Sequence, residues 1–128
     1  MKRKYSFKSY MNNELVSHIQ DIGEINVKNK VIEINISTYC FNIEKDKVTV
    51  TYFEPYENKF VFDKNRATET FYNTQYGMFH FEVHTSKLVY DSGVLEIMYS
   101  LYISDEKQAD YKIILKSLKN IDKKYRIF

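Results

Sequence analysis

The sequence predicts an all-β antiparallel fold, either a barrel or a sandwich. The first observation is a series of short runs in which apolar and polar residues alternate with period two, and turn residues separate the runs. The second is composition, because Tyr, Phe, Ile, Val and Thr dominate the middle of the chain and suit pleated, half-buried surfaces. With 128 residues and 44% apolar residues, we expect one folded domain over residues 1–128.

The N-terminal part is the least regular. Residues 1–10 and 121–128 are charged ends that we expect to be partly frayed. Residues 15–25 fit two alternatives. Met11, Leu15, Ile19 and Ile22 have helical spacing with Gly23 past the end, whereas period two gives a strand. We favour the strand because every later element is β.

Residues 31–43 predict one long strand, with a bulge or bend near residues 38–40 where the alternation blurs. Residues 44–47 are polar and predict a hairpin loop. Residues 48–53 then alternate again, and Pro55 ends this strand because proline cannot donate to a ladder.

Further strands are expected over residues 60–62, 66–76 and 78–88. In the last of these, Phe79, Phe81 and Val83 share the face that we expect to point inward. Gly77 precedes it and fits a tight turn or bulge.

The clearest strand covers residues 93–103, which alternate over ten residues after the turn cluster Asp91-Ser92-Gly93. Leu95, Ile97 and Leu101 should face inward. The other face carries Val94, Met98 and Tyr102, so neither side is polar, and we expect a terminal segment or a second copy to cover it. A homodimer is therefore predicted.

Residues 105–110 predict a charged turn, and residues 111–116 a final strand. About seven or eight antiparallel strands result. A closed barrel would leave no exposed strand edges, which suits a chain this rich in β-forming residues.

Three stretches together resemble the bacterial YwiB-like family, a domain of unknown function with a calycin-like, lipocalin-type β-barrel. They are Lys47–Glu54, with the aromatic arm 39–43 before it, Tyr76–Thr85 and Gly93–Ile103. The resemblance covers residues 16–118 and implies an antiparallel calycin-like barrel with no assigned reaction. The segment 55–75 is shorter than in the family, so the barrel is expected to be smaller, partly open or differently closed.

Charge and cysteine content narrow the function classes. Nineteen basic and seventeen acidic residues give a net charge of +2, and most basic residues are Lys, which makes a nucleic-acid binder unlikely. The basic segment 2–8 more often serves as a solubilising tail. No apolar run could span a bilayer, and the single Cys40 cannot form an internal disulfide, so we expect a cytoplasmic protein.

Reactive groups are sparse. His80, Glu82 and His84 lie at every second position of one strand, a spacing that could hold zinc but that more often marks a solvated face. Cys40 has apolar neighbours at period two and is expected to be a small buried residue rather than a nucleophile. No pair of carboxylates stands out for acid–base work. We therefore predict no catalytic residue, no metal and no cofactor.

The interior faces are the most informative feature. A barrel of eight strands can just hold a small ligand, and tyrosine hydroxyls would supply its polar contacts. Packing alone is the simpler expectation for these side chains. The candidate lining residues are Tyr52, Phe79, Phe81, Val83, Tyr99 and Leu101. The first hypothesis is a non-enzymatic protein that binds a small apolar or amphipathic molecule, and the alternative is a structural or interaction protein with a solid core.

Overall fold

The computed structural model describes residues 1–118, and these residues form ten β-strands. The strands are β1 (Lys2–Met11), β2 (Glu14–Lys28), β3 (Val31–Ile36), β4 (Tyr39–Glu44), β5 (Lys47–Tyr52), β6 (Asn58–Asp63), β7 (Thr68–Thr74), β8 (Gly77–Asp91), β9 (Val94–Ile103) and β10 (Glu106–Leu118). All neighbours in the sheet pair antiparallel, so the predicted all-β antiparallel class is confirmed. The strand count exceeds the seven or eight expected.

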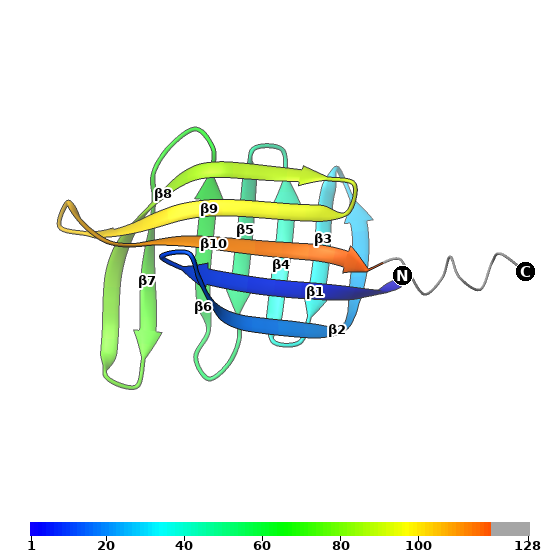
Figure 1. Cartoon of the computed structure of the whole chain (residues 1–128), viewed down its shortest axis with the longest axis horizontal. Helices are drawn as coiled ribbons and strands as arrows, with labels where there is room; N and C mark the ends of the chain where they lie inside the picture. Colours follow the sequence, from blue (N-terminus) through cyan, green and yellow to red (C-terminus); the bar gives the residue numbers. More distant parts are fainter. Residues whose placement is uncertain (119–128) are drawn as a thin grey trace, which may run out of the picture.

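The sheet curls into a nearly closed barrel of two layers. Its strand order is β6-β5-β4-β3-β2-β1-β10-β9-β8-β7. The strands β1, β9 and β10 run across the front layer, while β3 to β7 run steeply across them behind (Figure 1). The two longest strands, β2 and β8, belong to both layers: β2 pairs with β1 and then β3, and β8 pairs with β7 and then β9.

A glycine permits the layer change in β2. A Cβ atom on Gly23 would lie 2.9 Å from the backbone oxygen of Asn35 and 2.9 Å from Cδ2 of Tyr5. Real Cβ atoms do not approach other atoms this closely, so only glycine lets β2 bend over the buried Tyr5 ring.

Side chains close the barrel between β6 and β7. No ladder joins these two strands, but Asn58 Nδ2 donates to the Asn73 oxygen at 3.1 Å, and Asn58 Oδ1 accepts from the Asn73 amide at 2.6 Å. Thr70 Oγ1 donates to the Lys59 oxygen at 2.6 Å, and Thr68 Oγ1 donates to the Val61 oxygen. The segment 55–75 thus supplies two strands, β6 and β7, and the side chains that close the barrel between them.

Alternating residues from both layers form the core. Leu95 and Ile97 are fully buried and Leu101 nearly so, as the period-two pattern of this segment predicts. They pack with large side chains from β1, β3, β4, β5 and β6. Those with the least exposed surface are Tyr5, Ile34, Ile36, Phe41, Val48 and Phe62.

Several expectations about the elements were wrong. Residues 1–10 are not frayed: β1 pairs with both β2 and β10, because Tyr5 and Phe7 are buried against the opposite layer. Residues 31–43 form two strands, since Ser37 has a positive φ of 53° and begins a hairpin turn. The charged residues 106–110 belong to β10 and pair with β9, so the turn is confined to Ser104 and Asp105.

The strand over residues 15–25 is confirmed, as is the end of β5 before Pro55. Residues 121–128, expected to be frayed, lie outside the described residues. Among residues 1–118 there is no helix long and apolar enough to cross a membrane.

Candidate functional site

The interior of the barrel contains a cavity of about 470 Å³ that opens partly to solvent. Both layers contribute to its wall. Five tyrosines line it, namely Tyr39, Tyr52, Tyr72, Tyr99 and Tyr111. Four phenylalanines do so too, namely Phe7, Phe60, Phe62 and Phe81. The remaining lining residues are small or aliphatic, namely Ser9, Val16, Val50, Leu101 and Ile113.

The aromatic rings pack in pairs on opposite sides of the cavity. Tyr39 stacks on Tyr52 with ring centres 4.7 Å apart, because β4 and β5 place these residues directly opposite each other. Tyr99 stacks on Tyr111 at 5.1 Å across the β9–β10 ladder. Phe62 lies 4.6 Å from Tyr99 and joins the two layers. Strand register thus places the two rings of each stacked pair side by side, and the Phe62–Tyr99 contact links the pairs across the barrel.

The tyrosine hydroxyls are the main polar groups of this wall. Burial raises the pKa of Tyr99 far above its ordinary value of 10.0, and the nearby hydroxyls of Tyr111, Tyr39 and Tyr72 raise it further. Burial also raises the pKa of Tyr39 and that of Tyr111. These phenols are therefore neutral at physiological pH, and each can both donate and accept a hydrogen bond.

The structure brings four of the six predicted lining residues to the cavity: Tyr52, Phe81, Tyr99 and Leu101. Val83 is buried but packs within the core instead of lining the cavity. Phe79 was expected to point inward, yet it is 45% exposed. The β7–β8 hairpin extends beyond the end of β9, so Phe79 stays partly exposed although it lies opposite the cavity residue Tyr72.

Sequence reasoning missed other lining residues. Phe7 lies on β1, and the many Lys and Arg residues of this segment led us to expect a frayed end rather than a strand. Tyr39 follows the turn at residues 37–38, where the apolar–polar alternation of the sequence is irregular. Tyr72 lies on a predicted strand for which no inward face was assigned from the sequence. Tyr111 shares one face of the predicted final strand with Ile113, so the period-two pattern was a signal that could have identified it as a lining residue.

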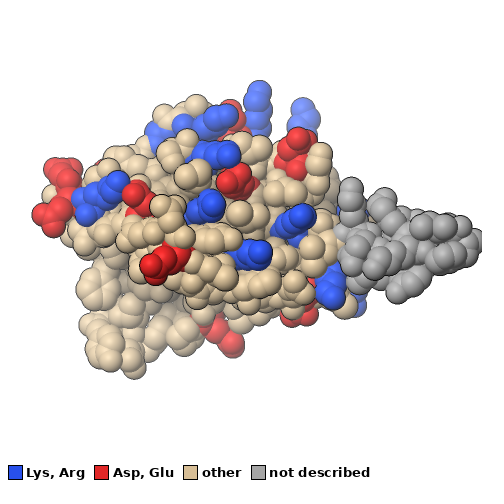
Figure 2. All heavy atoms as spheres, viewed as in Figure 1, with Lys and Arg blue, Asp and Glu red and all other residues tan. Residues whose placement is uncertain are grey.

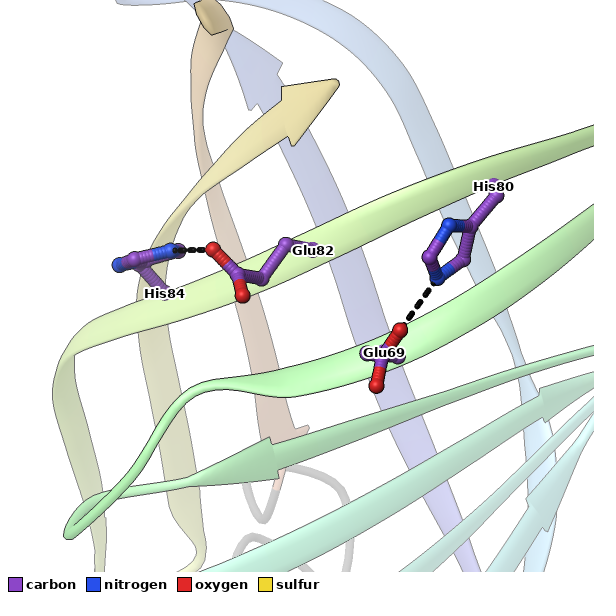
Figure 3. A network of polar contacts seen from close by, with 4 residues as sticks. All are labelled: Glu69, His80, Glu82 and His84. Atoms are coloured by element: carbon purple, nitrogen blue, oxygen red, sulfur yellow. Dashed lines mark hydrogen bonds and ion pairs between the residues drawn. The ribbon is translucent and has the colours of Figure 1, made fainter. Parts of the chain in front are cut away.

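The histidines of β8 form two separate exposed pairs rather than one cluster (Figure 3). His80 Nε2 lies 2.5 Å from Glu69 Oε1 on β7, and His84 Nε2 lies 2.7 Å from Glu82 Oε1. In the described part of the chain, no group of three His, Cys, Asp or Glu side chains is arranged to hold a metal ion. A polar surface hollow of about 280 Å³ lies beside Glu69, His80 and Glu82.

Cys40 is buried, but its side chain has polar neighbours rather than the expected aliphatic ones. Asn42 Nδ2 lies 3.7 Å and Glu33 Oε2 lies 4.0 Å from its Sγ atom. The turn at Ser37 reverses the alternation and places Cys40 opposite Asn35. Burial raises the pKa of the Cys40 thiol, and the Glu33 carboxylate raises it further, so the reactive thiolate is disfavoured.

Comparisons with known proteins place the chain in a family. A model described as "Domain of unknown function (DUF1934)" matches residues 20–115. The crystal structure of the ywiB protein from Bacillus subtilis has a similar fold, with a TM-score of 0.64, 12% sequence identity, and coverage of 92% of this chain and 94% of that chain. No curated protein matches. The predicted YwiB-like resemblance is thus confirmed, and the chain belongs to the DUF1934 family of domains of unknown function.

Proposed function

We propose that this protein is a non-enzymatic binding protein that holds a small apolar or amphipathic molecule inside its barrel, in the manner of lipocalin-type barrels. One observation supports the proposal above all: the interior holds a cavity of about 470 Å³. Protein interiors ordinarily leave few voids larger than a water molecule, whereas small-molecule sites have volumes of roughly 300–1,000 Å³. The cavity therefore favours binding over the solid core of the alternative hypothesis.

The chemistry of the wall supports binding without catalysis. Its titratable groups are tyrosines whose pKa values, where shifted, move upward, away from reactivity at neutral pH. Cys40 and the two His–Glu pairs do not line the cavity. We propose no cofactor and no metal, and a cytoplasmic location in keeping with the single cysteine.

The test is a fluorescence titration with the uncharged dye N-phenylnaphthylamine, whose emission rises in apolar surroundings. Val16 lines the cavity and is 56% exposed, so its side chain lies where the cavity meets solvent. The variant Val16→Trp should block the entrance and abolish the signal. The matched control Leu15→Trp changes an equally exposed neighbour that does not line the cavity, and it should bind like the wild type. Equal binding by both variants would refute the proposal.

One observation favours a second candidate role, contact with a second copy of the chain. The β7–β8 hairpin exposes Phe71, Tyr76 and Met78, and its tip is 84% exposed at Tyr76. The hairpin region shows no Lys, Arg, Asp or Glu on the face drawn in Figure 2, where it forms the tan lower-left part of the molecule. On the β9 face that was first expected to dimerise, Val94 and Met98 lie opposite Lys116 and Lys112.

Sedimentation velocity at tens of micromolar tests the homodimer. A dimer in the wild type that Phe71→Ser together with Met78→Ser converts to a monomer would support contact through the hairpin. A monomer throughout would remove this candidate.

A further inference from the structure

The five cavity tyrosines point to a ligand class, an inference that rests on the binding function proposed above. We propose that the barrel selects an uncharged ring-shaped molecule that carries hydrogen-bonding groups, and that the hydroxyls of Tyr72, Tyr99 and Tyr111 recognise those groups.

The first step concerns the hydrogen-bonding groups that the protein presents to the cavity. Within residues 1–118, the hydroxyls of Tyr39, Tyr52, Tyr72, Tyr99 and Tyr111 make no hydrogen bond to another protein group. These hydroxyls are not sealed in the core, because Thr85 Oγ1 is the one fully enclosed side-chain polar atom that lacks a partner in the same part of the chain. They are therefore open toward the cavity and free to bond a guest.

An apolar guest would leave these hydroxyls without partners. Removing a hydroxyl from water without a replacement hydrogen bond costs roughly 1–3 kcal/mol. A guest with its own donors and acceptors avoids this cost. The arrangement therefore discriminates between a hydroxylated molecule and its hydrocarbon counterpart.

The second step concerns charge. None of the fourteen residues that line the cavity is Lys, Arg, His, Asp or Glu. A charged guest would lose its hydration without gaining a counter-ion, which is expensive in a low-dielectric interior. Tyrosine faces can attract a cation, but the raised pKa values keep the phenols neutral, so no anionic group balances it.

The third step concerns shape. The stacked pairs Tyr39–Tyr52 and Tyr99–Tyr111 come from the two layers, and Phe60 and Phe62 complete an aromatic wall between them. Flat rings gain offset-stacked and edge-to-face contacts with such a wall beyond the area they bury. A planar ring system therefore fits this wall better than a flexible chain.

The experiment is a calorimetric titration of the full chain with four compounds that share one ring system: naphthalene, naphthol, naphthoate and naphthylmethylammonium. We expect naphthol to bind best, with naphthalene weaker by about two- to tenfold per lost hydrogen bond and both ions weaker still. Naphthalene binding as tightly as naphthol, or either ion binding more tightly than naphthol, would overturn the inference. No binding by any of the four compounds, together with a failed dye titration, would instead refute the proposed function.

Tyrosine-to-phenylalanine variants test whether these hydroxyls cause the preference for naphthol. A triple variant with Tyr72→Phe, Tyr99→Phe and Tyr111→Phe keeps the rings and removes three hydroxyls. It should lose the preference for naphthol while its affinity for naphthalene stays the same or rises. The control Tyr10→Phe removes a hydroxyl outside the cavity, where the ring lies 4.7 Å from Lys112 Nζ, and should change nothing. Retention of the naphthol preference in the triple variant would refute the assignment, and the compound series on the wild type decides the ligand class even if that variant does not fold.

Discussion

Two residue types determine the cavity chemistry and the shape of this barrel: tyrosines line the cavity, and Gly23 lets β2 bend from one layer into the other. Strand register places Tyr39 beside Tyr52 and Tyr99 beside Tyr111, and within residues 1–118 the hydroxyls of the cavity tyrosines make no hydrogen bonds to one another. Burial and this proximity both favour the neutral phenol, which raises the pKa of Tyr99, Tyr39 and Tyr111. The cavity wall therefore carries polar hydroxyl groups but no charged side chain.

The raised tyrosine pKa values predict how stability depends on pH. Below the ordinary tyrosine pKa of 10.0, the phenols are protonated in both the folded and the unfolded chain, and stability is unaffected. Above it, the unfolded chain releases these protons while the folded chain retains them, so the free energy of unfolding should fall as pH rises toward the folded pKa values. Tyrosinate absorbance of the folded protein should show that the phenols of Tyr39, Tyr99 and Tyr111 ionise only above the ordinary tyrosine pKa. Titration of all twelve tyrosines near their ordinary pKa in the folded protein would contradict this.

Gly23 is predicted to be the least replaceable residue of β2. Gly23→Ala forces a Cβ against the Asn35 backbone oxygen and the Tyr5 ring, so the layers must shift, at a cost of about 1–3 kcal/mol in the free energy of unfolding. Gln20→Ala, an exposed change on the same strand, should alter stability by less than about 0.5 kcal/mol. Urea unfolding measures both. Equal urea midpoints for the two variants would show that the space between Gly23, the Asn35 backbone oxygen and the Tyr5 ring can accept a Cβ atom, which would contradict this prediction.

At the scale of elements, the seam between β6 and β7 is the weakest junction of the wall. Every other junction is a ladder of backbone hydrogen bonds, whereas side chains of Asn58, Thr68 and Thr70 join these two strands. Side-chain bonds fix fewer backbone groups than a ladder does. The seam is thus where we expect the barrel to open first.

Removing one bond of the seam should destabilise the whole domain. Thr70 is buried, and Thr70→Val keeps its shape while leaving the Lys59 oxygen without its 2.6 Å partner, which should cost about 1–3 kcal/mol. Thr49→Val is the matched control, since the Thr49 hydroxyl makes no hydrogen bond in the described part of the chain. Urea midpoints and hydrogen exchange of the Asn73 amide report the effect. Unchanged exchange in Thr70→Val would mean that the seam does not hold the barrel closed.

The strands with clean alternation were predictable from the sequence, and the irregular ones were not. Residues 94–103 alternate because one face meets the core along the whole strand. The alternation fails at Ser37, where a positive φ lets the chain reverse its direction within two residues. In β1, the charged residues around Tyr5 and Phe7 make the segment look like a solvated chain end. Side-chain seams such as Asn58–Asn73 depend on how distant strands meet, and single-sequence periodicity does not encode that.

At the scale of the whole molecule, one ten-stranded sheet curls around a cavity, and most of its strands pair with a neighbour on both sides. Among residues 1–118, the two longest strands pair on one side alone along much of their length: β2 pairs with β1 alone over residues 14–23 and with β3 alone over residues 25–28, and β8 pairs with β7 alone over residues 77–81 and with β9 alone over residues 84–91. The candidate site was partly predictable because inward faces follow from period two. The size of the cavity was not predictable, because it depends on how far apart the two layers lie, and the alternation within single strands does not encode that distance.

The most direct test of the central claim is a nuclear magnetic resonance titration of the labelled protein with naphthol. The account predicts chemical-shift changes at Tyr99, Tyr111 and Phe81, which face the cavity, and none at Met98 and Lys112, which alternate with them on the outer face of the same strands. Changes confined to the exposed hairpin residues Phe71 and Met78, or no change at saturating naphthol, would contradict it.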